Sequence, residues 1–121
     1  MQVIIFSGFE NQIKSVGKKY KFDTQKFFNK LYLDISRNPK EQAVVIAETE
    51  SYQILKRRVK NPKIRKGKSH GFRIWYCLQE DKIFFCLFED VGEKVKEKST
   101  QYHIARIRAF FKAYRKETFD A

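Results

Sequence analysis

The sequence has little cysteine and no apolar run long enough to cross a bilayer. Its two cysteines, Cys77 and Cys86, are too few to form a zinc site by themselves. Residues 1–6 lack the basic leader and the cleavage site of a secretory signal peptide, so we expect a cytoplasmic location, where thiols remain free. These absences argue against a disulfide-stapled secreted domain, a zinc domain and a membrane-spanning protein.

Acidic residues are missing altogether between Ser51 and Gln79. The chain carries 26 lysines and arginines against 14 acids, a net charge of +12, and much of the excess falls in this acid-free segment. The basic residues of the segment are Lys56, Arg57, Arg58, Lys60, Lys63, Arg65, Lys66, Lys68 and Arg73. So much uncompensated positive charge favours an acidic partner, most simply a nucleic acid.

Length and composition indicate one domain, residues 1–121, with no internal repeat and no low-complexity linker. A chain of 121 residues can bury a single core. Because 42% of its residues are apolar and 16% are aromatic, it is not a disordered tail.

Hydrophobic periodicity predicts a first strand, two helices, a three-stranded meander and a last helix. These elements are a strand at 3–6, helices at 9–20 and from Asp23 or Thr24 to Asn38-Pro39, a strand or strand-like connection at 43–47, strands at 72–78 and 83–88, and a helix after Ser99 or Thr100. The order predicts an α+β fold, with a small antiparallel sheet, two N-terminal helices packed on one face and a C-terminal helix.

Strand alternation assigns side chains of the segment 72–78 to two faces. Phe72, Ile74 and Tyr76 lie on one face and should pack against the helices. Arg73, Trp75 and Cys77 share the other face, so we expect Arg73 to project onto the open face of the sheet. The segment 83–88 is apolar on both faces, so we expect it to be a central, covered strand.

The segment from Gly67 to Tyr76, GKSHGFRIWY, begins as a basic loop and continues into a predicted strand. It resembles the glycine-lysine-serine-glycine-glycine-aromatic-arginine-apolar-apolar-tyrosine stretch of the RelE/ParE superfamily of bacterial toxins, and in particular the RelE-like and HigB-like branch. The basic segment 55–58, the apolar segment 83–88, the charged segment 93–99 and the helix end at Asn38-Pro39 follow the order of that family. The resemblance covers nearly the whole chain and implies the same α+β fold.

Members of this branch are toxins of type II toxin–antitoxin systems that cleave mRNA, most of them in the ribosomal A site and without a metal or other cofactor. A 2′-hydroxyl attacks the adjacent phosphate, which requires removal of the hydroxyl proton, stabilisation of the phosphorane and a proton for the leaving oxygen. The resemblance therefore implies an endoribonuclease that acts on ribosome-bound message, inhibits translation and is neutralised by a cognate antitoxin.

The resemblance also implies catalytic residues in and beside the basic loop. Arg73 matches the family arginine and would clamp the scissile phosphate through its planar guanidinium. Lys66 and Lys68 would bind phosphate or act as a base. Lys94 falls where RelE proteins carry a second basic residue, for charge stabilisation or leaving-group protonation. His70 stands where the family has a small residue, and it is either a general base or a solvated loop side chain.

Other basic residues are candidates for RNA binding. Lys63 and Arg65 belong to the same basic segment as the catalytic candidates. Arg57 and Arg58 alternate in an extended strand, so only one of them can reach the surface that carries Arg73.

Three ring-bearing residues complete the set of RNA-binding candidates. Trp75 projects on the Arg73 face, where it can stack on a base or fill the sheet. Tyr102 and His103 stand nearest to the late tyrosine of the family. Both fall in the first turn of the last predicted helix, where packing or simple exposure competes with a role in RNA binding.

Two alternative functions stay open. One is inhibition of DNA gyrase, as ParE-type members do, and the other is a non-catalytic RNA-binding or ribosome-binding module. The basic loop with Arg73 favours RNA cleavage over gyrase inhibition, because a gyrase inhibitor has no need of a phosphate-clamping centre.

Overall fold

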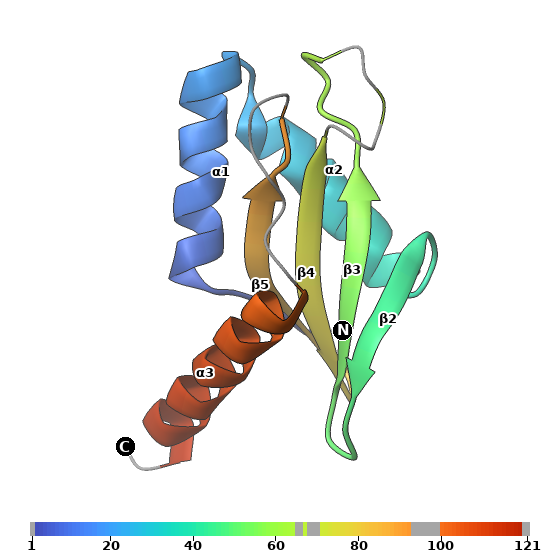
Figure 1. Ribbon diagram of the computed structural model, residues 1–121, viewed down its shortest axis with the longest axis vertical. Helices are drawn as coiled ribbons and strands as arrows, with labels where there is room; N and C mark the ends of the chain where they lie inside the picture. The colour runs from blue at the N-terminus through green and yellow to red at the C-terminus, as the bar shows by residue number, and fades with distance from the viewer. Residues whose placement is uncertain (1, 65–66, 68–70, 93–99, 120–121) are drawn as a thin grey trace.

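The computed structural model describes residues 2–64, 67, 71–92 and 100–119, with side chains described as far as residue 114. Within these residues, five strands form one sheet with helices on both of its faces (Figure 1). In chain order the elements are β1 (Gln2–Ile5), α1 (Ser7–Tyr20), α2 (Thr24–Arg37), β2 (Ala43–Glu48), β3 (Gln53–Val59), β4 (Phe72–Gln79), β5 (Lys82–Asp90) and α3 (Thr100–Phe119). The predicted α+β class is confirmed, as is the order of the predicted elements.

The sheet is mixed rather than purely antiparallel, which corrects one detail of the prediction. Its strand order is β1-β5-β4-β3-β2, and the four strands from β2 to β5 form an antiparallel meander, one strand more than predicted. β1 pairs parallel to β5, with Ile5 opposite Phe85. Since the chain from α1 to β4 separates these two strands, no hairpin forces them to run in opposite directions. The segment predicted as a strand or a connection forms the edge strand β2.

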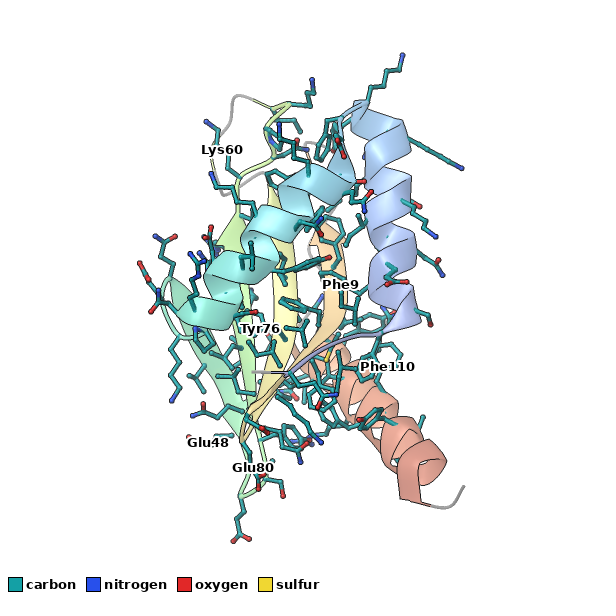
Figure 2. All side chains as sticks on the ribbon, turned by 180° about the vertical axis from the view of Figure 1, so that it is seen from behind. Phe9, Glu48, Lys60, Tyr76, Glu80 and Phe110 are labelled. Atoms are coloured by element: carbon teal, nitrogen blue, oxygen red, sulfur yellow. The ribbon has the colours of Figure 1, made fainter. Side chains whose placement is uncertain are left out.

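The helices α1 and α2 cover one face of the sheet, which we call the α1/α2 face (Figure 2). Of the two caps predicted for α2, Asp23 or Thr24, the structure has Asp23, whose carboxylate accepts a hydrogen bond from the backbone N–H of Lys26 at 3.1 Å. α2 ends at Arg37, before Asn38-Pro39. The buried cluster on this face consists of Phe9, Ile13, Val16, Phe28, Ile35, Leu55, Val59, Phe72, Ile74, Tyr76, Ile83, Phe85 and Phe88.

The last helix, α3, packs on the opposite face, which we call the α3 face. In Figure 1 it lies in front of one end of the sheet, while α2 lies behind the sheet. Ile104, Ile107 and Phe111 anchor α3 in a second buried cluster with Trp75 and Phe84. Helices therefore cover both faces of the sheet and not a single face.

β4 and β5 follow the predicted alternation and lie inside the sheet. Every residue from Ile83 to Phe88 is buried, as expected for a covered central strand. The hairpin turns at Glu80-Asp81, between the paired residues Gln79 and Lys82. Cys77 and Cys86 are free, buried thiols whose sulfur atoms are 3.9 Å apart, and burial raises the pKa of the Cys86 thiol.

Candidate active site

The chain on either side of residues 65–70 is held together where β3 ends and β4 begins. A Cβ atom on Gly71 would lie 2.2 Å from the carbonyl oxygen of Val59, so only glycine fits at this position. The Gly71 carbonyl accepts a hydrogen bond from the N–H of Val91 at 2.9 Å, which ties the end of β5 to the same corner. Asn61 is fully buried, and its side-chain oxygen accepts from the N–H of Lys63 at 2.9 Å. The end of β3, the start of β4 and the end of β5 are therefore packed closely together.

Arg73 lies on the α3 face, opposite the face of Phe72 and Ile74, as alternation predicts. Its cross-strand neighbours are Arg58 on β3 and Glu89 on β5. The side chain is only 2% exposed, which contradicts the expectation that it projects onto an open surface. β4 is the middle strand of the sheet, so Arg73 has a neighbouring strand on each side. One guanidinium nitrogen, Nη1, donates to the Phe72 carbonyl at 3.3 Å.

Glu89 reaches the same face because of a β-bulge. The register shifts between Trp75 and Tyr76 on β4, which leaves Cys86 on β5 as an extra, unpaired residue. As a result Cys86 and Leu87 both belong to the cluster on the α3 face. Strict alternation without this extra residue would turn Glu89 toward α1 and α2. A bulge that re-aims a side chain in this way is a recurrent device near functional sites.

His103 meets Glu89 from α3. Its Nε2 lies 3.0 Å from the Oε2 of Glu89, and the His103 residue is 3% exposed. The imidazole ring packs against the indole of Trp75, with ring centroids 4.7 Å apart. The other ring nitrogen, Nδ1, is buried and has no hydrogen-bond partner within the described part of the chain. His103 is thus a packed residue of the first turn of α3, and its Nδ1 atom forms no hydrogen bond with any other described residue.

Two neighbouring rings differ in their exposure. Trp75 is fully buried, so it fills the sheet and presents no open ring to an RNA base. The ammonium group of Lys56 lies 5.3 Å from the centroid of the Trp75 ring. Tyr102 is 46% exposed, and the guanidinium carbon of Arg106 lies 5.7 Å from the centroid of its ring.

β3 divides its basic residues between the two faces. Arg58 pairs with Arg73 and Lys56 pairs with Trp75, so both lie on the α3 face, where Arg58 is exposed. Arg57 lies on the α1/α2 face beside Tyr76 and is not part of the Arg73 site. Burial raises the pKa of Tyr76 to about 12, although the positive charge of Arg57 opposes the increase.

The remaining candidates do not join this group in the described part of the chain. Lys63 is exposed and lines a groove beside α2 on the other side of the sheet. The candidates Arg65, Lys66, Lys68, His70 and Lys94 lie outside the described residues.

Sequence reasoning did not select Glu89 or Lys56 as site residues. Lys56 has a detectable signal, since it stands two residues before Arg58 in a strand and so shares its face. Glu89 has no such signal, because the segment 83–88 is apolar on both faces and conceals the change of phase at the bulge.

The described residues thus bring together a guanidinium, a carboxylate and an imidazole on one face of the sheet, with Lys56 and Arg58 beside them. Among the same residues, no three histidine, cysteine, aspartate or glutamate side chains cluster closely enough to hold a metal ion. The described helices also include none that is both long and apolar enough to span a bilayer. Comparisons with family models, curated proteins and solved structures found no match.

Proposed function

We propose that this protein is a metal-independent endoribonuclease of the RelE/ParE type, the toxin of a type II toxin–antitoxin system, which cleaves ribosome-bound mRNA. The observation that carries the proposal is the group of Arg73, Glu89 and His103 on the α3 face. The group combines a phosphate-binding side chain with a side chain suited to proton transfer. Arg73 belongs to the acid-free segment between Ser51 and Gln79, which carries nine basic residues.

The three side chains can take complementary parts in attack by a 2′-hydroxyl. Arg73 would bind the scissile phosphate and stabilise the added negative charge of the phosphorane. If the Nε2 of His103 donates to the Glu89 carboxylate, the neutral ring has a lone pair on Nδ1 for the 2′-hydroxyl proton. Glu89 is then a positioning residue, which fixes the ring tautomer and its orientation.

Charges around this centre would hold the rest of the RNA. Arg58 is exposed and Lys56 half-buried on the same face, so both can contact phosphates next to the scissile bond. Lys66, Lys68, His70 and Lys94 are proposed to complete the site on the grounds of the resemblance, as phosphate ligands or as the acid for the leaving oxygen.

Burial sets a condition on this mechanism. Arg73 is 2% exposed and His103 is 3% exposed, so RNA can reach them only after a local opening of the α3 face. Closure of this face over the bound RNA would then exclude water from the reacting atoms.

The same burial favours a second candidate, a non-catalytic RNA-binding module. In that case Glu89 and His103 would stabilise the junction of α3 with the sheet. RNA would contact only exposed basic residues such as Arg58.

The deciding experiment is induced expression of the chain in bacteria, with message ends mapped by primer extension. We expect growth arrest and new message ends for the wild-type chain and for Lys112→Ala, a change on an exposed part of α3. His103→Asn should produce neither. Growth arrest without new ends would support the non-catalytic module or gyrase inhibition. A soluble wild-type chain that does not arrest growth would contradict the toxin proposal.

The proposed partners are mRNA, the ribosome and a cognate antitoxin. A net charge of +12 favours an antitoxin rich in acidic residues, because charge complementarity speeds encounter and selects the partner. Purification of the chain with the product of a neighbouring gene tests this part of the proposal.

A further inference from the structure

A groove of about 840 Å³ lies on the α1/α2 face, between α2 and the turn that follows β3. Phe22, Phe27, Leu31 and Val59 form its apolar floor. Phe27 and Leu31 are one helical turn apart, so the groove follows the axis of α2. In Figure 2, α2 crosses in front of the sheet, and the labelled Lys60, in the turn that follows β3, lies above the helix. Phe22, Phe27 and Leu31 stay partly exposed, so the chain itself does not cover the floor.

Lysines stand on both banks of the groove. Lys26 and Lys30 project from α2, and Lys60 and Lys63 belong to the turn. All four are exposed, and within the described residues none of them forms an ion pair. Of the two acids in the lining, Asp23 is engaged as the N-cap of α2. The banks therefore have an excess of positive charge over an apolar floor.

This combination suits a peptide better than RNA. Phe27 packs edge-on against Phe22 and Phe28, with ring centroids 5.5 and 5.0 Å apart, and so does not form a flat platform for a base. A concave apolar floor instead accepts branched or aromatic side chains, while flanking carboxylates reach the lysines.

We infer that the groove docks an acidic amphipathic helix of a partner protein. Apolar side chains spaced at i and i+4 on the partner would fill the floor along Phe27 and Leu31, and acidic residues on either side would pair with the lysines. The groove lies on the opposite side of the sheet from Arg73. A partner held there leaves the Arg73 site open unless another part of it reaches around the sheet.

The test uses the full chain and a display library of random peptides about four helical turns long. The selected peptides should share apolar residues at i and i+4 flanked by acids. Fluorescence anisotropy of a labelled selected peptide should show at least about tenfold weaker binding to the double variant Lys26→Glu/Lys30→Glu, and a similar loss for Leu31→Glu.

Two matched controls separate the groove from overall charge and from helix damage. Lys18→Glu/Lys112→Glu makes the same change in net charge at exposed sites outside the groove. Leu33→Glu places the same new side chain on an exposed part of α2 that does not line the groove. Both controls should bind the peptide within about twofold of wild type at physiological ionic strength, where salt screens the effect of distant charges.

Other outcomes overturn the inference. They are selected peptides without the acidic amphipathic pattern, or equal losses in the groove and control variants. Loss of oligonucleotide binding, rather than peptide binding, in Lys26→Glu/Lys30→Glu would reassign the groove to RNA. Because no step of the assay uses RNA cleavage, its result does not depend on whether the chain is a nuclease.

Discussion

The two faces of the sheet bury very different side chains. On the α1/α2 face, the rings of Phe9, Phe28, Phe72 and Phe88 interlock, with centroid distances from 4.8 to 6.3 Å. On the α3 face, apolar packing under α3 gives way to Arg73, Glu89 and His103, two of which are almost fully buried. The same strands therefore support an apolar core on one side and a polar cluster on the other.

The difference indicates that the α3 face is not optimised for stability alone. Taking charged groups out of water costs several kcal/mol per ion, and well-packed apolar residues in their place often stabilise a protein. A buried group of this kind is a probabilistic marker of function, which supports a functional role for the polar cluster. The α1/α2 face needs no such explanation, since its aromatic packing is sufficient to hold the sheet and helices together.

The largest effect is expected on the apolar side. Phe28 is 1% exposed and packs between α1 and β4, so Phe28→Ala should lower the free energy of unfolding by about 3–5 kcal/mol. Denaturant titration followed by circular dichroism measures this change. Leu33→Ala on the exposed side of α2 is the matched control and should stay within about 0.5 kcal/mol of wild type. A loss below about 1 kcal/mol for Phe28→Ala would show that this face is not the main core.

On the polar side, the proposed nuclease function predicts that Arg73→Ala reduces cleavage of ribosome-bound message on the order of 100- to 1,000-fold. Arg73→Lys should recover little, because a point charge cannot reproduce two parallel hydrogen bonds to phosphate. Single-turnover cleavage measures both variants. Because Arg73 is buried, the unfolding free energy of each variant must be measured alongside.

Arg108→Ala changes an exposed arginine of α3 and serves as the matched control, with cleavage near the wild-type rate. If folded Arg73→Ala cleaves at the wild-type rate, the active site lies elsewhere. If Arg73→Ala unfolds while Arg73→Lys folds and cleaves normally, the arginine is structural.

Local sequence signals predicted the fold well, and non-local pairing accounts for what they missed. The Asp23 cap and the helix end before Asn38-Pro39 depend on a few adjacent residues, and both predictions are confirmed. The parallel pairing of β1 with β5 and the turn of Glu89 toward His103 depend on which strands meet and in which register. Alternation therefore gave the correct face for Arg73 but not its burial, which depends on neighbours distant in the sequence.

A smaller effect is expected from the hydroxyl of Tyr76, a polar group on the α1/α2 face. The Tyr76 hydroxyl donates to the Pro39 carbonyl, and burial raises the pKa of Tyr76 from 10.0 to about 12. The folded protein thus binds this proton more tightly than the unfolded chain does. The associated stability is complete below pH 10 and is lost as the pH rises through about 12.

Tyr76→Phe should therefore cost about 1 kcal/mol at neutral pH, through the lost hydrogen bond, and reduce the loss of stability between neutral pH and about pH 11 by about 1–2 kcal/mol. Urea unfolding at neutral pH and at about pH 11 measures both parts. Tyr32, whose pKa burial also raises, contributes in the same direction and should leave some alkaline dependence in Tyr76→Phe. An unchanged alkaline slope would contradict the buried-hydroxyl explanation.

The smallest effect separates two consecutive carboxylates, Glu89 and Asp90, which strand alternation places on opposite faces of the sheet. Glu89 meets buried His103, whereas Asp90 turns toward α1, where Lys19 lies 3.1 Å from its Oδ2 and Tyr20 donates to both carboxylate oxygens. The Lys19 side chain is 55% exposed, so water and salt screen its charge, and Lys19→Ala should cost only about 0.2–1 kcal/mol. Glu89→Gln alters a buried pair and should cost more, about 1–3 kcal/mol.

Unfolding measured at low and high salt distinguishes the two variants, because added salt should erase the Lys19 effect and leave the Glu89 effect. Equal, salt-insensitive losses would mean that the two carboxylates do the same structural work, and the contrast between the faces would then rest on Arg73 alone.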